Sequence, residues 1–185
     1  MSRVLPVNYN GAFCYNILIT NEFDGLAEQV KNLGYGSDKK FCIVTDSNVA
    51  LLYAETVKEE LGREFANVFL YTVPAGEEHK NVETINGIYE FLIQNRFDRQ
   101  DVLVALGGGV VGDMTGYAAA TYLRGIDFIQ VPTTLLSQTD SSIGGKTGVD
   151  FMQYKNMVGA FYMPKLVYMN LLVLEKYPMS GGQIL

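Results

Sequence analysis

The stretch Asp140–Asp150 (DSSIGGKTGVD) combines carboxylates, hydroxyls and a lysine with two adjacent glycines. Its Gly145-Lys146-Thr147 matches the end of a phosphate-binding P-loop, which also needs a glycine five positions before the second glycine. In this sequence that position is Asp140. Because a carboxylate there would repel a triphosphate, the sequence argues against a nucleoside triphosphate site and calls for another explanation of the cluster.

The wider segment Val131–Asp150 is polar in a way that core segments are not, and a second polar pair follows it closely. Lysines and an asparagine around a carboxylate predict a pocket for a small, polar, anionic molecule, since lysine binds phosphate as a point charge. The alternative is a capped surface helix with scattered lysines. The polar residues concerned are Thr133, Thr134, Asp140, Ser141, Ser142, Lys146, Lys155 and Asn156.

A glycine-rich turn stands after an apolar run, in VLVALGGGVVGDMTGYAAA. Gly107, Gly109 and Gly112 match G-x-G-x-x-G, in which glycines let the backbone and the start of a helix approach a phosphate. The dinucleotide fingerprint also expects an acidic residue at the end of the next strand, whereas Asp127 stands at its start. The turn therefore predicts a phosphate site outside the usual Rossmann arrangement, or a turn that serves packing alone.

Asp46 and Asn48, in VTDSNV, follow a predicted strand and are candidates for contact with a ribose at the carboxyl edge of a sheet. The alternative is a helix N-cap with a neighbouring turn residue.

Glu77 and Lys80, in PAGEEHK, follow the next predicted strand at helical spacing, either as site residues or as a solvated helix start. His79 is the only histidine, and we expect it to be an exposed neighbour. Because a catalytic zinc site uses three protein ligands, we predict no metal site within this chain.

The elements that must position these residues alternate between strands and helices. Several strands are apolar at consecutive positions, as in strands covered on both faces, and helical periodicity marks 49–61 and 82–93. This alternation predicts an α/β fold, a Rossmann-like parallel sheet with helices on both faces. The predicted strands are 15–20, 40–45, 68–73, 102–106, 128–131 and 165–169.

Composition narrows the class further. The chain is 48% hydrophobic and 18% charged, which indicates a globular protein, and its net charge of −6 argues against a nucleic-acid surface. No apolar run approaches the length of a membrane span, and no signal peptide opens the chain. Cys14 and Cys42 lack a partner motif, so we expect two reduced thiols and a cytoplasmic protein.

Taken together, LVALGGGVVGDMTGYAAATYLRGIDFIQVPTTLLSQTDSSIGGKTGVD and KNMVGAFYMP resemble the 3-dehydroquinate synthase family of sugar-phosphate cyclases. VTDSNV and PAGEEHK match earlier motifs of that family, so the resemblance runs from about Tyr15 to Pro178. It implies a two-domain enzyme. Residues 1–178 would be the NAD-binding domain, and residues 179–185 would begin the connection to a helical domain that supplies most zinc ligands and substrate contacts.

The resemblance also implies roles for individual residues. Asp46 and Asn48 would take the adenosine ribose with Glu77 and Lys80 nearby, and the glycine turn would hold the pyrophosphate. A substrate-phosphate contact would come from Arg124, in this subunit or a neighbouring one. The implied cofactor contacts at the turn and beyond are Gly108, Gly109, Val110, Asp113, Thr133, Thr134, Leu136 and Ser141, and those facing nicotinamide and substrate are Asp140, Lys146, Lys155 and Asn156.

The implied reaction converts 3-deoxy-D-arabino-heptulosonate 7-phosphate, a phosphorylated sugar acid, to 3-dehydroquinate and phosphate in the shikimate pathway. The cofactors would be NAD and, in the full-length enzyme, zinc or cobalt. The resemblance further implies a homodimer when full length, with neither nucleic acid nor membrane as a partner. Another sugar-phosphate cyclase, a related metal-dependent dehydrogenase and a non-catalytic nucleotide-binding module are the alternatives.

Four features depart from the family pattern. Tyr154 replaces a glycine before the Lys-Asn pair, Asn170 replaces an aspartate, and Glu175-Lys176 replace Lys-Thr. The chain also ends before the helix that carries the family's first zinc-ligating glutamate. We therefore expect a domain fragment that is inactive alone.

Overall fold

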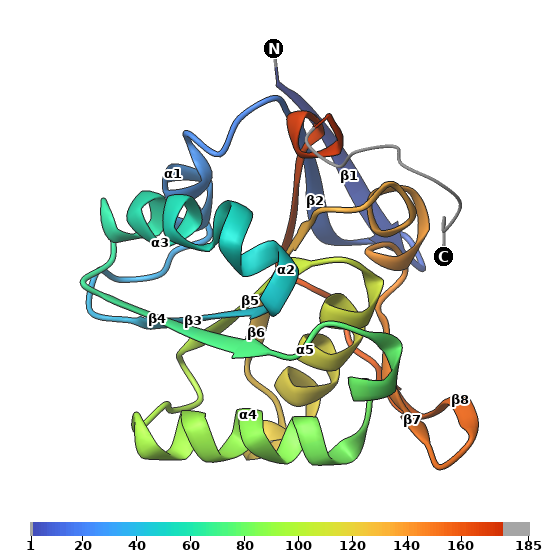
Figure 1. The fold of residues 1–185 in the computed structure, drawn as a ribbon. Coiled ribbons are helices and arrows are strands. Elements are labelled where there is room, and N and C mark those ends of the chain that lie inside the picture. Colours follow the sequence, from blue (N-terminus) through green and yellow to red (C-terminus); the bar gives the residue numbers. More distant parts are fainter. Residues whose placement is uncertain (1, 176–185) are drawn as a thin grey trace.

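A computed structural model describes residues 2–175, and a seven-stranded sheet runs through the centre of this part of the chain (Figure 1). The strand order is β1-β2-β9-β6-β5-β3-β4. Every neighbouring pair is parallel except β1 and β2, which form an antiparallel edge. The strands are β1 (Arg3–Tyr9), β2 (Ala12–Thr20), β3 (Lys40–Asp46), β4 (Asn67–Val73), β5 (Val102–Gly107), β6 (Asp127–Pro132) and β9 (Leu166–Asn170).

Helices cover both faces of the sheet, which confirms the predicted fold class. On one face lie α1 (Leu26–Lys31) and the run α2 (Ser47–Val49), π-helical Ala50–Ala54 and α3 (Glu55–Gly62); on the other lie α4 (Val82–Gln94) and α5 (Gly109–Thr121) (Figure 1). Alternate residues of a strand pack on opposite faces of the sheet: Ile43 packs against the helices of the first face, and Cys42 and Val44 pack against those of the second. Consecutive apolar residues therefore mark strands that are buried on both sides.

α5 lies close to the sheet because its small residues allow it. A Cβ at Gly116 would overlap the side chain of Thr147 and press against the ring of Phe128, and a Cβ at Gly107 would overlap Val111. Gly107, at the end of β5, and Gly116, in α5, are thus required by close packing.

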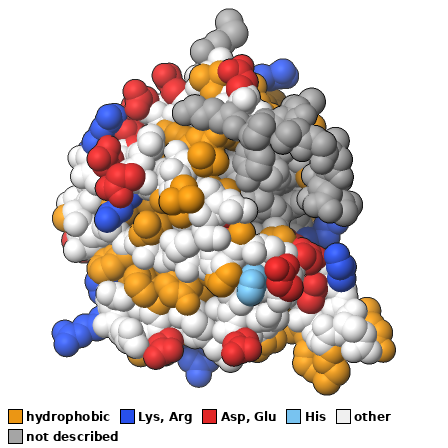
Figure 2. Space-filling model, in the orientation of Figure 1, with side chains coloured by type: hydrophobic (Ala, Val, Ile, Leu, Met, Phe, Trp, Pro, Cys, Tyr) orange, Lys and Arg blue, Asp and Glu red, His pale blue; other side chains and the backbone are white. Residues whose placement is uncertain are grey.

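A hairpin that the sequence did not indicate follows the sheet's sixth strand. β7 (Lys146–Phe151) and β8 (Tyr154–Phe161) form a separate antiparallel pair that projects from the body and carries exposed apolar side chains (Figures 1 and 2). The alternative of one capped helix here is wrong. Only a helical turn, Ser137–Ser141, precedes Gly144 and Gly145, whose positive φ values of 92° and 68° end it.

The remaining elements are short. Single 3₁₀ turns span Glu77–His79, Tyr122–Arg124 and Leu171–Leu174. Cys14 and Cys42 are both free thiols, as predicted. None of the described helices combines the length and apolar character needed to span a bilayer. The predicted domain boundary at residue 178 and the connection 179–185 lie outside the described residues.

Candidate nucleotide-binding cleft

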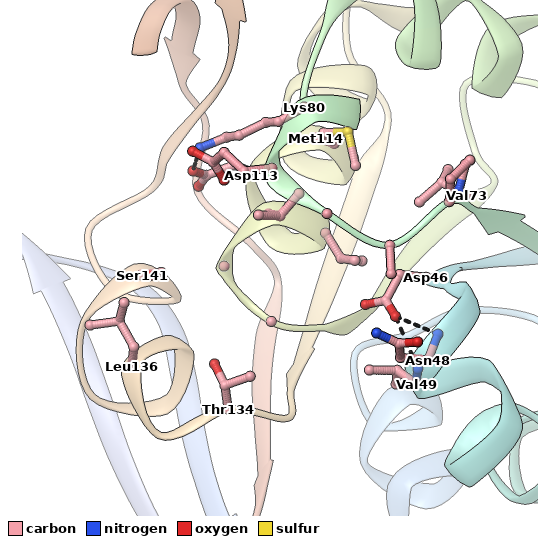
Figure 3. A pocket seen from close by; sticks show the side chains of 18 of the residues that line it. Asp46, Asn48, Val49, Val73, Lys80, Asp113, Met114, Thr134, Leu136 and Ser141 are labelled. Carbon is pink, nitrogen blue, oxygen red and sulfur yellow. Dashed lines mark hydrogen bonds and ion pairs between the residues drawn. The ribbon is translucent and has the colours of Figure 1, made fainter. Parts of the chain in front are cut away.

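A cleft of about 470 Å³ opens at the edge of the sheet where β3, β4 and β5 end (Figure 3). These strands are parallel, so Asp46, Val73 and Gly107 finish at the same edge although they are far apart in sequence. The first turn of α5 forms the floor between them. The position agrees with the rule that ligands of open α/β sheets bind beyond the carboxyl ends of the strands.

The start of α5 has the properties of an anion site. Gly108 is the N-cap and contributes no side-chain cap, so the first N–H groups of the 13-residue helix have no side-chain acceptor at the cap. A Cβ at Gly109 would stand 3.0 Å from Ser141 Oγ, and one at Gly108 would stand 3.2 Å from Thr134 Cγ2. Both glycines and Val110 line the cleft. The turn therefore combines close backbone approach with the positive end of a helix dipole.

Asp46 lies at one end of the cleft and acts as an N-cap, which was the alternative considered from sequence. Its Oδ1 accepts hydrogen bonds from the N–H groups of Asn48, at 2.8 Å, and Val49, at 3.0 Å (Figure 3). The capping role does not remove it from the cleft, because Asp46, Asn48 and Val49 all line the cavity. Asp46 thus caps the helix and also lines the cleft.

Lys80 lies across the cleft from Asp46 and is almost fully buried. Its Nζ donates to Oδ2 of Asp113 at 2.6 Å and to Oδ1 of Asn156 at 2.6 Å. The exposed fractions of the Lys80 and Asp113 side chains are 5% and 22%. Burial raises the pKa of the Asp113 carboxyl above its usual range, and the Lys80 ammonium opposes this rise without cancelling it. Lys80 and Asp113 therefore form a largely desolvated pair beside the start of α5.

A second cavity of about 490 Å³ adjoins the first and shares Asp113, Ser141 and Asn156 with it. Asp140 and Lys146 line this second cavity, and both side chains are exposed. β8 closes it through Gly159, Ala160 and other residues of the hairpin. Asp140, Ser141, Lys146 and Asn156 thus lie around one space, and the hairpin carries Lys146 and Asn156.

Most residues singled out in the sequence lie at these two cavities. Lys155 reaches Glu77, with Nζ 3.4 Å from Oε1, and both line the first cavity with Thr134 and the half-exposed Leu136. Thr133 differs. It is fully buried behind the cleft, its N–H donates to Gly107 O at 2.9 Å, and its Oγ1 has no partner in the described part of the chain.

Arg124 lines neither of the two cavities of its own chain. α5 starts at the carboxyl edge and runs back along the sheet, and Arg124 follows its far end just before β6 begins at Asp127. The side chain is exposed there. A contact from Arg124 to a neighbouring subunit stays a prediction.

His79 lies at the surface beside acidic side chains (Figure 2). Its Nε2 is 3.9 Å from Glu78 Oε1. Across residues 2–175, no three His, Cys, Asp or Glu side chains gather as a metal site would require.

The structure shows the surroundings of the residues that depart from the family pattern. Tyr154 begins β8 without a positive φ, so this position does not require the conformational freedom of glycine; Met152 and Asn156 are the residues nearby with positive φ, at 55° and 56°. Asn170 Oδ1 accepts from Leu172 N–H at 3.0 Å, a bond that an aspartate could also accept. Glu175 follows the last 3₁₀ turn, and Lys176 lies outside the described residues.

Sequence reasoning missed the apolar and backbone part of the cleft. Val73, Val111 and Met114 line it, together with the turn 74–76 that follows β4. Their position at a strand end and in the first turns of α5 was the available signal. Apolar side chains at such positions usually belong to the hydrophobic core, so their residue types alone could not show that they line a cleft.

Comparisons with known proteins agree with this architecture. A profile of the 3-dehydroquinate synthase N-terminal domain matches residues 70–182. The 3-dehydroquinate synthase of Pelobacter propionicus is 51% identical over 176 residues, which are 95% of this chain and 48% of that protein. The enzyme of Synechocystis sp. is 48% identical over 178 residues, 96% of this chain and 49% of that one.

A solved structure shares the fold. A crystal structure of 2-deoxy-scyllo-inosose synthase with carbaglucose-6-phosphate, NAD⁺ and Co²⁺ matches 95% of this chain and 48% of its own, with a TM-score of 0.85 at 27% identity. The chain thus spans about half the length of the relatives it matches. On the profile match and these identities, the chain belongs to the 3-dehydroquinate synthase family, in which it corresponds to the N-terminal domain.

Proposed function

We propose that this chain is the NAD-binding half of a 3-dehydroquinate synthase and that NAD lies in the cleft beyond β3, β4 and β5. The observation that carries the proposal is the start of α5. There, an uncapped helix N-terminus with two glycines opens into a cleft that has Asp46 on one side and the Lys80–Asp113 pair on the other. The geometry fits an extended ligand that is anionic at its middle.

The residues present fit the parts of a dinucleotide. The carboxylate of Asp46 and the amide of Asn48 can hydrogen-bond ribose hydroxyls, with Glu77 near them. The N–H groups at Gly108, Gly109 and Val110 can bind the pyrophosphate. Toward the second cavity the nicotinamide end would meet Asp113, Ser141 and Asn156, the residues that both cavities share. Thr134 and Leu136 complete the wall between the two.

The second cavity suits a small anionic substrate. Lys146 supplies a cation, Asp140 supplies an acceptor for a hydroxyl, and Gly148 and Gly159 add backbone without side chains to the cavity wall. We propose that it takes the phosphorylated sugar acid 3-deoxy-D-arabino-heptulosonate 7-phosphate and that the products are 3-dehydroquinate and phosphate. Support comes from the inosose synthase, whose structure holds a sugar-phosphate analogue and NAD⁺ together.

In this reaction, NAD would supply transient oxidation of one ring hydroxyl and its later reduction. The chain's own residues bind, orient and stabilise charge. Lys146 would hold an anionic oxygen of the substrate, Asp140 would orient a hydroxyl, and Lys80 would hold the Asp113 carboxyl in place beside the helix start. Thr133 has a buried hydroxyl with an unused hydrogen-bonding capacity directly behind the turn, which suits a second contact to the cofactor if the turn adjusts on binding.

The choice of 3-dehydroquinate synthase over another cyclase rests on identity. Curated 3-dehydroquinate synthases are 44–54% identical to this chain over the aligned residues, whereas the inosose synthase is 27% identical. We propose that residues 1–178 are the NAD-binding domain and that a second domain supplies the zinc or cobalt ligands and further substrate contacts. On this proposal the 185-residue chain binds NAD weakly, has no turnover alone, and forms its active homodimer only as part of the longer protein in the cytoplasm.

A glycine pair tests the cofactor assignment. In Gly109→Ala the new methyl would lie 3.0 Å from Ser141 Oγ at the proposed pyrophosphate site, while Gly62→Ala adds a methyl with nothing within 4 Å. Calorimetric titration with NAD up to millimolar concentration should show binding by wild type and Gly62→Ala and a loss of roughly tenfold or more for Gly109→Ala. Absence of binding by the wild type, or equal binding by all three, contradicts the assignment.

A further inference from the structure

Asp150 lies in β7 outside both cavities, yet it makes two hydrogen bonds to residues that line them. Its Oδ1 accepts from the N–H of Asn156 at 2.7 Å, and its own N–H donates to the carbonyl of Lys80 at 2.8 Å. A parallel bridge between Asn81 and Asp150 extends this contact. Asp150 is therefore one of the points at which the hairpin is joined to the loop that carries Lys80.

Asn156 needs such a contact. Its φ of 56° is in the left-handed region, which non-glycine residues occupy at a cost, although asparagine tolerates it better than most. A hydrogen bond from its N–H to the Asp150 carboxylate is charge-assisted and short, so it stabilises this local conformation. The register between β7 and β8 shifts at the same place, between Val149 and Phe151, which leaves Asp150 out of the regular ladder and free to make this bond.

The conformation of Asn156 in turn determines the surroundings of Lys80. The Asn156 Oδ1 is one of two acceptors for the Lys80 Nζ, and the other is Asp113 Oδ2. Asp150 thus acts on Lys80 at both ends: through the backbone carbonyl directly, and through the ammonium by way of Asn156. Loss of the Asp150 carboxylate would release Asn156 and leave Lys80 with one fixed acceptor.

We propose that Asp150 is a positioning residue for the cofactor and substrate sites, which it serves by holding Asn156 and Lys80 at the boundary between the two cavities. The inference rests on the proposed function for its consequence, because Lys80 and Asn156 matter to a ligand only if one binds there. The alternative is that Asp150 stabilises the hairpin alone. The carboxylate lines neither cavity, so its effect on ligand binding would pass through Asn156, to which it is hydrogen-bonded.

Three variants separate these possibilities. Asp150→Ala removes the acceptor, Asp150→Asn keeps an Oδ1 acceptor in the same place, and Gln153→Ala changes an exposed side chain in the turn of the same hairpin. For each, the NAD dissociation constant is measured by calorimetry on the 185-residue chain, and the amide proton shift of Asn156 and its exchange rate are measured by NMR. Thermal unfolding of each variant checks that the fold is retained.

We expect Asp150→Ala to weaken NAD binding roughly 3- to 10-fold, the effect of one net hydrogen bond, with Asp150→Asn and Gln153→Ala near wild type. The Asn156 amide should move upfield and exchange faster in Asp150→Ala alone. Equal NAD affinity in all variants, or an equal loss in Asp150→Ala and Asp150→Asn, overturns the inference. If wild type does not bind NAD, the proposed function fails; an unchanged Asn156 amide in Asp150→Ala then overturns the positioning role separately, and a shifted one supports it.

Discussion

The Nζ of Lys80 lies 2.6 Å from Oδ2 of Asp113, and together these side chains join the loop after β4 to the first turns of α5. The pair is short and largely desolvated, and the Lys80 ammonium influences the titration of Asp113. Burial is the larger effect on Asp113 and raises the pKa of its carboxyl, while Lys80 acts in the opposite direction.

Replacement of Lys80 by methionine should raise the pKa of Asp113 further, because the opposing charge and hydrogen bond are lost while burial remains. A carboxyl with a raised native pKa binds its proton more tightly in the folded state. The contribution of this carboxyl to stability is therefore greatest at low pH and is lost as pH rises through its native pKa, and in Lys80→Met this loss should extend to higher pH. Carbon-13 NMR of the aspartate carboxyls measures the shift directly. Lys165→Met, which breaks the ion pair to Asp127 at the other end of the sheet, is the control and should leave Asp113 unchanged.

Gly116 is expected to tolerate no side chain. A Cβ there would overlap Thr147 and press against Phe128, so Gly116→Ala should force α5 away from β6 and β7 and reduce the free energy of unfolding by about 1–3 kcal/mol. Chemical denaturation gives this value, and Gly62→Ala should change stability by less than about 0.5 kcal/mol. Equal stability of the two variants would mean that α5 does not pack against the sheet as described.

Asn170 provides a test of the last described turn. Its Oδ1 caps Leu171–Leu174, so Asn170→Ala should lower stability by about 1 kcal/mol, while Asn170→Asp keeps the acceptor and should remain near wild type. Thermal or urea unfolding measures both. A loss of stability in Asn170→Asp as large as that in Asn170→Ala would show that the amide nitrogen, not the capping oxygen, matters.

Lys146 tests the second cavity in the full-length enzyme. Lys146→Ala removes the cation that we propose holds an anionic oxygen of the substrate, so cyclase activity should fall by at least about two orders of magnitude with the fold retained. The phosphate-release rate and circular dichroism measure the two properties. Retention of full activity would exclude Lys146 from the site.

The sheet could be read from the sequence because its strands are covered on both faces. The six runs predicted from consecutive apolar residues coincide with β2, β3, β4, β5, β6 and β9, within one to three residues at their ends. β1 escaped notice because its side chains are mostly exposed and Pro6 interrupts the run. It is an edge strand, for which hydrophobic pattern gives little signal.

The cleft was predictable only in part. The glycine turn and the residues after β3 and β4 could be placed at one edge, because parallel strands end together. The hairpin could not, since Gly148 and Gly159 hide its strand pattern; a Cβ at Gly148 would stand 2.7 Å from Val158 O, so these glycines are required by the close approach of β7 and β8. The pairing of Lys80 with Asn156 depends on that hairpin and was therefore out of reach.

A crystal structure of the chain with NAD tests the central claim most directly. We predict the pyrophosphate oxygens within about 3 Å of the backbone N–H groups at Gly108 and Gly109, with the adenosine ribose at Asp46 and the nicotinamide toward Lys146. A coenzyme bound at another surface, or a start of α5 that stays closed to it at saturating NAD, would contradict the account.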